Sequence, residues 1–181
     1  MIDKLSLRIA TFIRQNNEQA ASMDVLMFSL AVVLNAIFVA VMIIIIAIFT
    51  NRLPEALALL ASFVTLRFFS GGMHLPTSKL CNFISIGLFV VLMLLPVSYW
   101  NAGLVLNSAA LAFVLLFAPT KDIMHLNLLG PKYTIHFKIV CVLLVSVNFW
   151  IQSPILALAF FSQTLTLTPI AYKGVALFER R

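Results

Sequence analysis

The chain has 181 residues, of which 62% are hydrophobic and only 10% are charged, and its mean hydropathy is +1.09. So few polar groups cannot cover a water-soluble surface, which excludes a soluble globular protein. The formal net charge is +6. Its basic residues are dispersed at the ends of apolar runs and form no continuous stripe, so we expect contact with anionic membrane lipid and not with nucleic acid.

A transmembrane helix needs about 20 apolar residues, so this length has room for roughly six spans and no separate soluble domain. We therefore predict an all-α, polytopic membrane protein with a single membrane domain over residues 1–181. Residues 1–24 carry apolar residues at helical spacing and predict an amphipathic helix that lies in the membrane interface. Residues 25–172 form the predicted transmembrane bundle, and residues 173–181 a cytoplasmic tail.

Six apolar runs make up the predicted bundle, and they cover residues 25–49, 56–69, 80–99, 102–118, 137–151 and 155–172. The second and fifth runs are short for a full crossing. Each of these two runs is therefore expected to form either a strongly tilted helix or a re-entrant one.

The orientation follows from lysine and arginine, which are retained on the cytoplasmic side when they lie near span ends. With the amino terminus inside, eleven of the twelve basic residues fall inside and only Arg52 falls outside. The inside set is Lys4, Arg8, Arg14, Arg67, Lys79, Lys121, Lys132, Lys138, Lys173, Arg180 and Arg181. We predict that both termini are cytoplasmic.

The connection between the second and third runs reads RFFSGGMHLPTSKLC over residues 67–81. Gly71 and Gly72 end a helix and permit backbone angles that other residues avoid, and Pro76 resists continuation. Thr77 or Ser78 is a good cap for the next helix. Cys81 is therefore expected in a first helical turn.

A cysteine in that position is favoured as thiolate by the helix dipole and by the nearby charges of Lys79 and Arg67. The thiolate is the nucleophilic form. His74 lies seven residues earlier, at the end of the glycine turn, where its imidazole can reach the sulfur and act as general base and then acid. The alternative is that the cysteine and the histidine are unrelated neighbours.

The remaining polar residues have plainer interpretations. Arg67 either extends its guanidinium to the lipid headgroups or binds a carbonyl or carboxylate of a substrate. Cys141 lies between two valines in mid-span, as a packed and inert thiol would. His125 and His136 are expected to be interfacial polar residues.

Arg67, Gly72, His74 and Cys81, supported by residues 118–121 and 165–169, resemble the accessory gene regulator B (AgrB) family. These are membrane cysteine endopeptidases that process quorum-sensing propeptides in Gram-positive bacteria. The likeness covers nearly the whole chain. The chain departs from the family in its central loop, where Lys121, Lys132 and Lys138 are dispersed instead of clustered.

The resemblance implies a mechanism in the bacterial cell membrane, with the site on the cytoplasmic side. Cys81 attacks a carbonyl of an AgrD-like propeptide, with His74 as base and then acid, and forms a thioester. A thiol or hydroxyl of the substrate then opens it to a thiolactone or lactone, with no cofactor and no metal. Gly71 and Gly72 are candidate amide donors to the oxyanion, and Lys79 and Lys121 candidate supporting residues.

The resemblance also implies a homodimer. The residue that orients His74 is left open between Asn82, Ser78 and a backbone carbonyl. Three rival functions are a small membrane transporter or exporter of a peptide, a metal-dependent or aspartyl membrane protease, and a non-catalytic scaffold. The protease rival lacks both a His-Glu-x-x-His motif and an acid pair in the predicted spans. The six acidic residues all lie at run ends or in loops, which argues against ion-coupled transport.

Overall fold

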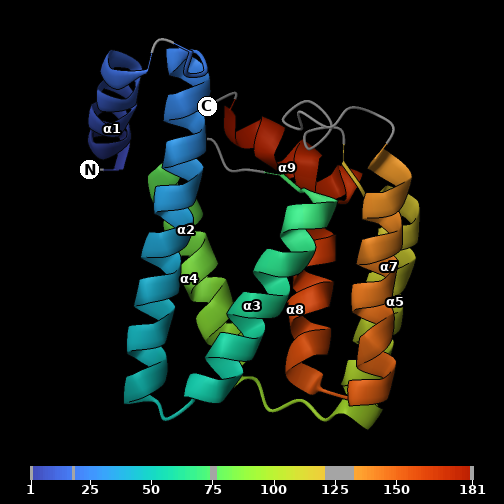
Figure 1. Ribbon diagram of the computed structural model, residues 1–181. Helices are drawn as coiled ribbons and strands as arrows, with labels where there is room; N and C mark the ends of the chain where they lie inside the picture. The colour runs from blue at the N-terminus through green and yellow to red at the C-terminus, as the bar shows by residue number, and fades with distance from the viewer. Residues whose placement is uncertain (1, 18, 74–76, 121–132, 180–181) are drawn as a thin grey trace.

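The computed structural model describes residues 2–17, 19–73, 77–120 and 133–179, and within these ranges it contains helices and no strands. The all-α prediction is confirmed. In chain order the elements are α1 (Ile2–Asn16), α2 (Met23–Phe49), α3 (Leu53–Ser70), α4 (Ser78–Leu94), the π-helical turn η1 (Tyr99–Gly103), α5 (Leu104–Phe117), α7 (Thr134–Ile151), α8 (Pro154–Leu165) and α9 (Pro169–Glu179) (Figure 1).

The described helices include four that are long and apolar enough to cross a membrane: α2, α3, η1 joined to α5, and α7. Together, α8 and α9 would make a fifth span, bent by 58° at the break between them. α4 is apolar but shorter, with 17 residues. A polytopic membrane protein is thus confirmed, with four or five helices that meet these criteria where about six spans were predicted.

Two apolar runs end earlier than predicted, and a proline accounts for each break. The run over residues 80–99 stays helical only to Leu94, because Pro96 follows and the residue before a proline is driven toward extended angles. The run over residues 155–172 is broken after Leu165, ahead of Pro169. Both α3 and α7 are continuous 18-residue helices and are among the four candidate spans, so their length and composition allow each to cross a membrane.

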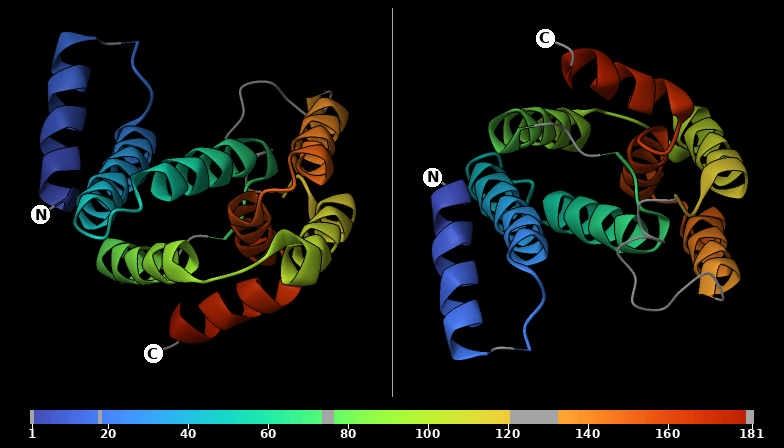
Figure 2. Two further views of the ribbon diagram at one scale, coloured as in Figure 1. Left: turned by 90° about the horizontal axis from the view of Figure 1, so that it is seen from below. Right: turned by 90° about the horizontal axis from the view of Figure 1, so that it is seen from above.

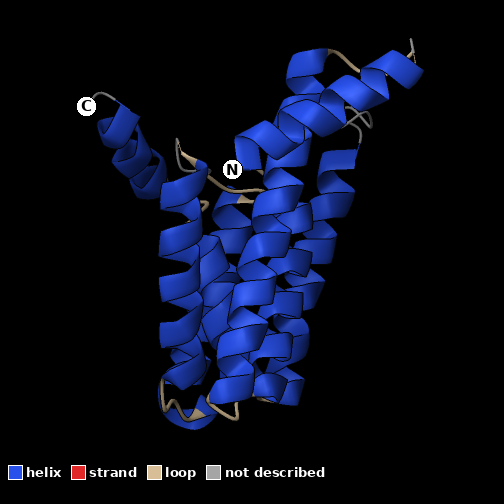
Figure 3. Ribbon diagram, turned by 90° about the vertical axis from the view of Figure 1, so that its left-hand side faces the viewer, coloured by secondary structure: helices blue, strands red, loops and turns tan. Residues whose placement is uncertain are grey.

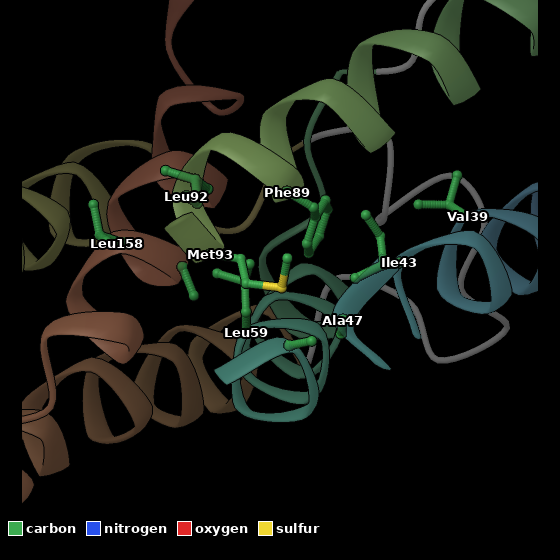
Figure 4. Close-up of a cluster of buried hydrophobic side chains, with 10 residues drawn as sticks. Val39, Ile43, Ala47, Leu59, Phe89, Leu92, Met93 and Leu158 are labelled. Atoms are coloured by element: carbon green, nitrogen blue, oxygen red, sulfur yellow. The ribbon is translucent and has the colours of Figure 1, made fainter. Parts of the chain in front are cut away.

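The helices pack around two clusters of buried apolar side chains. The first joins α2, α3, α4 and α8 and includes Ile43, Leu59, Phe89 and Met93 (Figure 4). The second joins α3, α5, α7 and α8 and includes Cys141. α3 and α8 contribute to both clusters and lie between the α2–α4 pair and the α5–α7 pair, as the views along the bundle show (Figure 2).

α1 packs beside α2 at one end of the bundle (Figure 3). Its small residues Ser6 and Ala10 are buried, while Leu5 and Phe12 are exposed. Since these exposed apolar side chains share the helix with exposed Lys4 and Arg8, α1 has the amphipathic character that was predicted for it.

Both termini lie at the same end of the bundle as the end of α3 and the start of α4 (Figure 1). We call this the site end. In the described part of the chain, Arg52 is the one basic residue in a connection at the opposite end, where it pairs with Glu55 at 3.1 Å.

Candidate functional site

Cys81 lies in the first turn of α4, as predicted. Thr77 is the cap: its side-chain oxygen accepts a 3.3 Å hydrogen bond from the amide of Leu80. The amide of Cys81 donates to the Thr77 carbonyl at 3.0 Å, which closes the first turn of the helix. The thiol is free and half-buried. A thiol in this position is partly shielded by protein and still accessible.

His74 lies outside the described residues, as do Lys121 and His125. The pairing of His74 with Cys81 therefore stays a prediction. The residues on both sides of this gap are described, so the path of the chain into it and out of it is defined at Met73 and Thr77.

The turn after α3 requires its two glycines. Gly71 has φ 77° and Gly72 has φ 133°, which are angles that other residues rarely adopt. A Cβ at Gly72 would also overlap the hydroxyl oxygen of Thr166 and lie 3.3 Å from Arg67 Nη1. The backbone of Gly72 is therefore pressed against the end of α8, which leaves no room for a side chain.

Arg67 is directed into the protein. Its Nη2 donates to the carbonyl oxygen of Met73 at 2.8 Å, and its Nη1 donates to Oε1 of Gln163 at 3.3 Å. The snorkelling alternative does not hold, because two guanidinium nitrogens are hydrogen-bonded within the protein at the site end.

Gln163 of α8 connects these groups and is fully buried. Its Nε2 donates to the carbonyl oxygen of Gly71 at 2.6 Å and to Oγ of Ser70 at 3.2 Å. One turn later, the carbonyl of Thr166 accepts a 3.2 Å hydrogen bond from the amide of Met73. The end of α8 thus holds the turn that leads from Arg67 toward His74.

The sequence pattern alone does not single out Gln163 or Thr166 as site residues. The one signal is that Gln163 is an amide in an otherwise apolar run, LAFFSQTL over residues 158–165. A second buried polar residue joins the turn from the segment after α5, since the amide of Thr120 donates to the carbonyl of Ser70 at 2.9 Å.

The other predicted residues are distributed as follows. Lys79 is exposed in the first turn of α4, and His136 is exposed in α7, where its ring contacts Tyr133. Cys141 is fully buried in the second cluster, as predicted for a packed thiol. In the described part of the chain, Oδ1 of Asn82 is buried without a hydrogen-bond partner, so Asn82 is an open acceptor next to Cys81.

Comparison with known proteins gives a match to one family model, described as accessory gene regulator B, over residues 6–171. The match includes α3, α4 and α8, which carry Arg67, Cys81 and Gln163. Neither the curated proteins nor the solved structures give a match. The resemblance noted from the stretch around Cys81 is confirmed.

Proposed function

Because the chain belongs to the accessory gene regulator B family, whose members take part in processing quorum-sensing propeptides, we propose that it is a membrane cysteine endopeptidase with Cys81 as its nucleophile. One observation carries the proposal: the free thiol of Cys81 lies half-buried in the first turn of α4, which also carries Lys79. The helix dipole and a nearby cation both stabilise a thiolate.

In the proposed reaction, the Cys81 thiolate adds to a backbone carbonyl of an AgrD-like propeptide. His74 holds the thiol proton and gives it to the departing amine as the peptide bond breaks, which leaves a thioester on Cys81. A thiol or hydroxyl within the substrate then attacks the thioester, releases Cys81 and closes a thiolactone or lactone ring. Each step exchanges one acyl bond for another, so neither an oxidant nor ATP is consumed.

The glycine turn supplies one candidate donor for the oxyanion. The amide of Gly71 donates to the Arg67 carbonyl at 2.9 Å, and the amide of Met73 is committed to Thr166. Of the two glycines proposed as donors, only Gly72 is therefore retained, because in the described part of the chain its amide is not committed to a backbone carbonyl.

The proposed orientation puts the site end in the cytoplasm. The described elements at this end carry Lys4, Arg8, Arg14, Arg67, Lys79, Lys138 and Lys173, whereas the connections at the opposite end carry Arg52. Positive charge near span ends marks the cytoplasmic side. A cytoplasmic propeptide with an amphipathic leader would then reach Cys81 along the membrane surface, beside the exposed apolar residues of α1.

We also propose that the protein acts as a homodimer in anionic lipid, as the family resemblance implies. α2 offers one surface for the contact, because Ala36 is exposed on it. Ala47 of the same helix is fully buried within the chain and is not part of that surface.

The thioester is the direct test of the proposal. The purified protein is mixed with propeptide and its intact mass is followed by mass spectrometry. The proposal predicts a gain equal to the amino-terminal propeptide fragment, mapped to Cys81 and removed by hydroxylamine. Cleavage without an adduct at Cys81, or with an adduct on another residue, would contradict it.

A further inference from the structure

We propose that Gln163 of α8 is a positioning residue for the turn that ends at Met73, directly before His74 in the sequence, an assignment that rests on the proposed cysteine endopeptidase. Gln163 does not contact the nucleophile. It acts through Arg67 and Gly71, both of which it hydrogen-bonds. The site would then depend on a helix that lies 96 residues from Arg67 in the sequence.

Met73 is the residue directly before His74, and both polar groups of its backbone are bonded. Its amide donates to the Thr166 carbonyl at 3.2 Å, and its carbonyl accepts from Arg67 Nη2 at 2.8 Å. One group is therefore held by the end of α8 and the other by α3. These two bonds fix the backbone of Met73, the last described residue before His74.

Gln163 fixes the guanidinium that makes one of those bonds. Its Oε1 accepts from Arg67 Nη1, and its Nε2 donates to the Gly71 carbonyl, so one amide holds both the arginine and the glycine turn. This role requires a side chain with a hydrogen-bond acceptor and a hydrogen-bond donor on the same carbon, as in a carboxamide. An apolar residue of the same length would leave the Gly71 carbonyl without this donor and Arg67 without this acceptor.

The consequence for the reaction is geometric. General base catalysis requires the imidazole within hydrogen-bond reach of the thiol, about 2.6–3.2 Å between heavy atoms. A displacement of about 1 Å can lower a rate by about 100-fold. Releasing Arg67 and Gly71 would let the residues around Met73 shift by such an amount, and His74, the proposed base, follows Met73 directly in the sequence. We therefore expect base catalysis to weaken while substrate binding elsewhere is retained.

The experiment compares Gln163→Met and Gln163→Glu with wild type and with Thr164→Val, in detergent or in lipid vesicles. Met keeps the volume of glutamine without its polar atoms. Glu keeps the acceptor for Arg67 but places a second acceptor against the Gly71 carbonyl. Thr164 is equally buried on the same helix, and its hydroxyl donates locally to the Phe161 carbonyl, so Thr164→Val is the matched control.

Two readouts are taken on the folded fraction of each variant, checked by size exclusion and thermal melting. The first is propeptide cleavage, in which kcat is expected to fall by about 10- to 100-fold with KM nearly unchanged. The second is the pH profile of iodoacetamide alkylation at Cys81, read by peptide mass. We expect alkylation about 10-fold slower at pH 7 and equal to wild type at pH 10, because a displaced His74 no longer promotes the thiolate.

The alkylation profile of His74→Ala is measured in parallel, and the Gln163 variants should approach it. Wild-type kcat and a wild-type alkylation profile in either folded Gln163 variant would overturn the inference. An alkylation rate that falls equally at every pH, in proportion to the loss of folded protein, would also overturn the inference. Gln163 would then be a packing residue. Failure of the proposed function itself gives a different result, namely cleavage that persists in Cys81→Ala.

Discussion

The side-chain amide of Gln163 donates a 2.6 Å hydrogen bond to the carbonyl oxygen of Gly71, across 92 residues of sequence. This bond joins the end of α8 to the turn that leaves α3. Because Gln163 is fully buried and also accepts from Arg67, the turn is held by protein groups inside the bundle. The connection between α3 and α4 thus begins from a fixed point, and substitutions there have specific expected effects.

Gly72→Ala is expected to abolish cleavage and to lower the thermal stability of the protein. The new Cβ would overlap the Thr166 hydroxyl, and a φ of 133° is strained for alanine. Strain of this kind costs about 1–3 kcal/mol. The measurements are propeptide cleavage by mass spectrometry and the melting temperature in detergent.

The control for this prediction is Gly87→Ala on α4, where a Cβ meets no atom within 4 Å. Alanine in a helix interior is favoured over glycine by about 0.5–1 kcal/mol, so this variant should be at least as stable as wild type and fully active. Equal activity of the Gly72 and Gly87 variants would contradict the packing described for the turn.

Arg67→Lys is expected to lower kcat by about 10-fold or more. A guanidinium reaches Met73 and Gln163 through two different nitrogens, and a single ammonium on a flexible stem cannot hold the same geometry. The measurement is the rate of propeptide cleavage. Arg52→Lys, which alters an exposed ion pair at the opposite end, should leave the rate unchanged. Full activity of the Arg67→Lys variant would show that the charge alone suffices.

Asn148→Leu is expected to destabilise the bundle without changing kcat. Asn148 and Asn107 are both fully buried, and Nδ2 of Asn148 donates to Oδ1 of Asn107 at 3.0 Å and to the Ser153 carbonyl at 3.1 Å. Loss of these bonds leaves buried groups unpaired, at about 1–3 kcal/mol. Thermal melting measures the effect, with the exposed Asn101→Ala as control. A loss of kcat in the folded variant would contradict the expectation that this asparagine pair stabilises the bundle without affecting the site end.

Cys81 is expected to react with a membrane-impermeant thiol reagent in the native protein, and Cys141 only after denaturation. The first thiol is half-buried at the site end, whereas the second has no exposed surface. Labelling is mapped by peptide mass in right-side-out and inverted vesicles. The proposed orientation predicts labelling of Cys81 only from the cytoplasmic face; labelling only from outside would contradict it.

The sequence was sufficient for the class of fold and for the local structure around Cys81. Apolar composition requires a bilayer and therefore helices, and Thr77 followed by Ser78 and Lys79 is enough to place Cys81 in a first helical turn. These features depend on residues that are close in sequence. Of the two predicted caps, Thr77 and Ser78, Thr77 is the one observed, and the prediction that Cys141 is packed is confirmed.

The remaining features depend on contacts between distant segments. The hydropathy of residues 155–172 is continuous, so it hides the bend before Pro169. Nothing in the residues near Arg67 indicates that its partner is an amide on α8. A buried glutamine in an apolar run marks a polar contact within the bundle, but the partner becomes visible only when the helices are packed.

The most direct test of Cys81 as the nucleophile is to co-express the chain with its propeptide and to follow the propeptide mass with wild type, Cys81→Ser, Cys81→Ala and Cys141→Ala. We expect cleavage by wild type and by Cys141→Ala, and none by either Cys81 variant expressed at the same level. Cleavage that persists without Cys81 would contradict the central claim and move the nucleophile elsewhere. No cleavage by any form, with the correct propeptide present, would favour a peptide exporter or a scaffold instead.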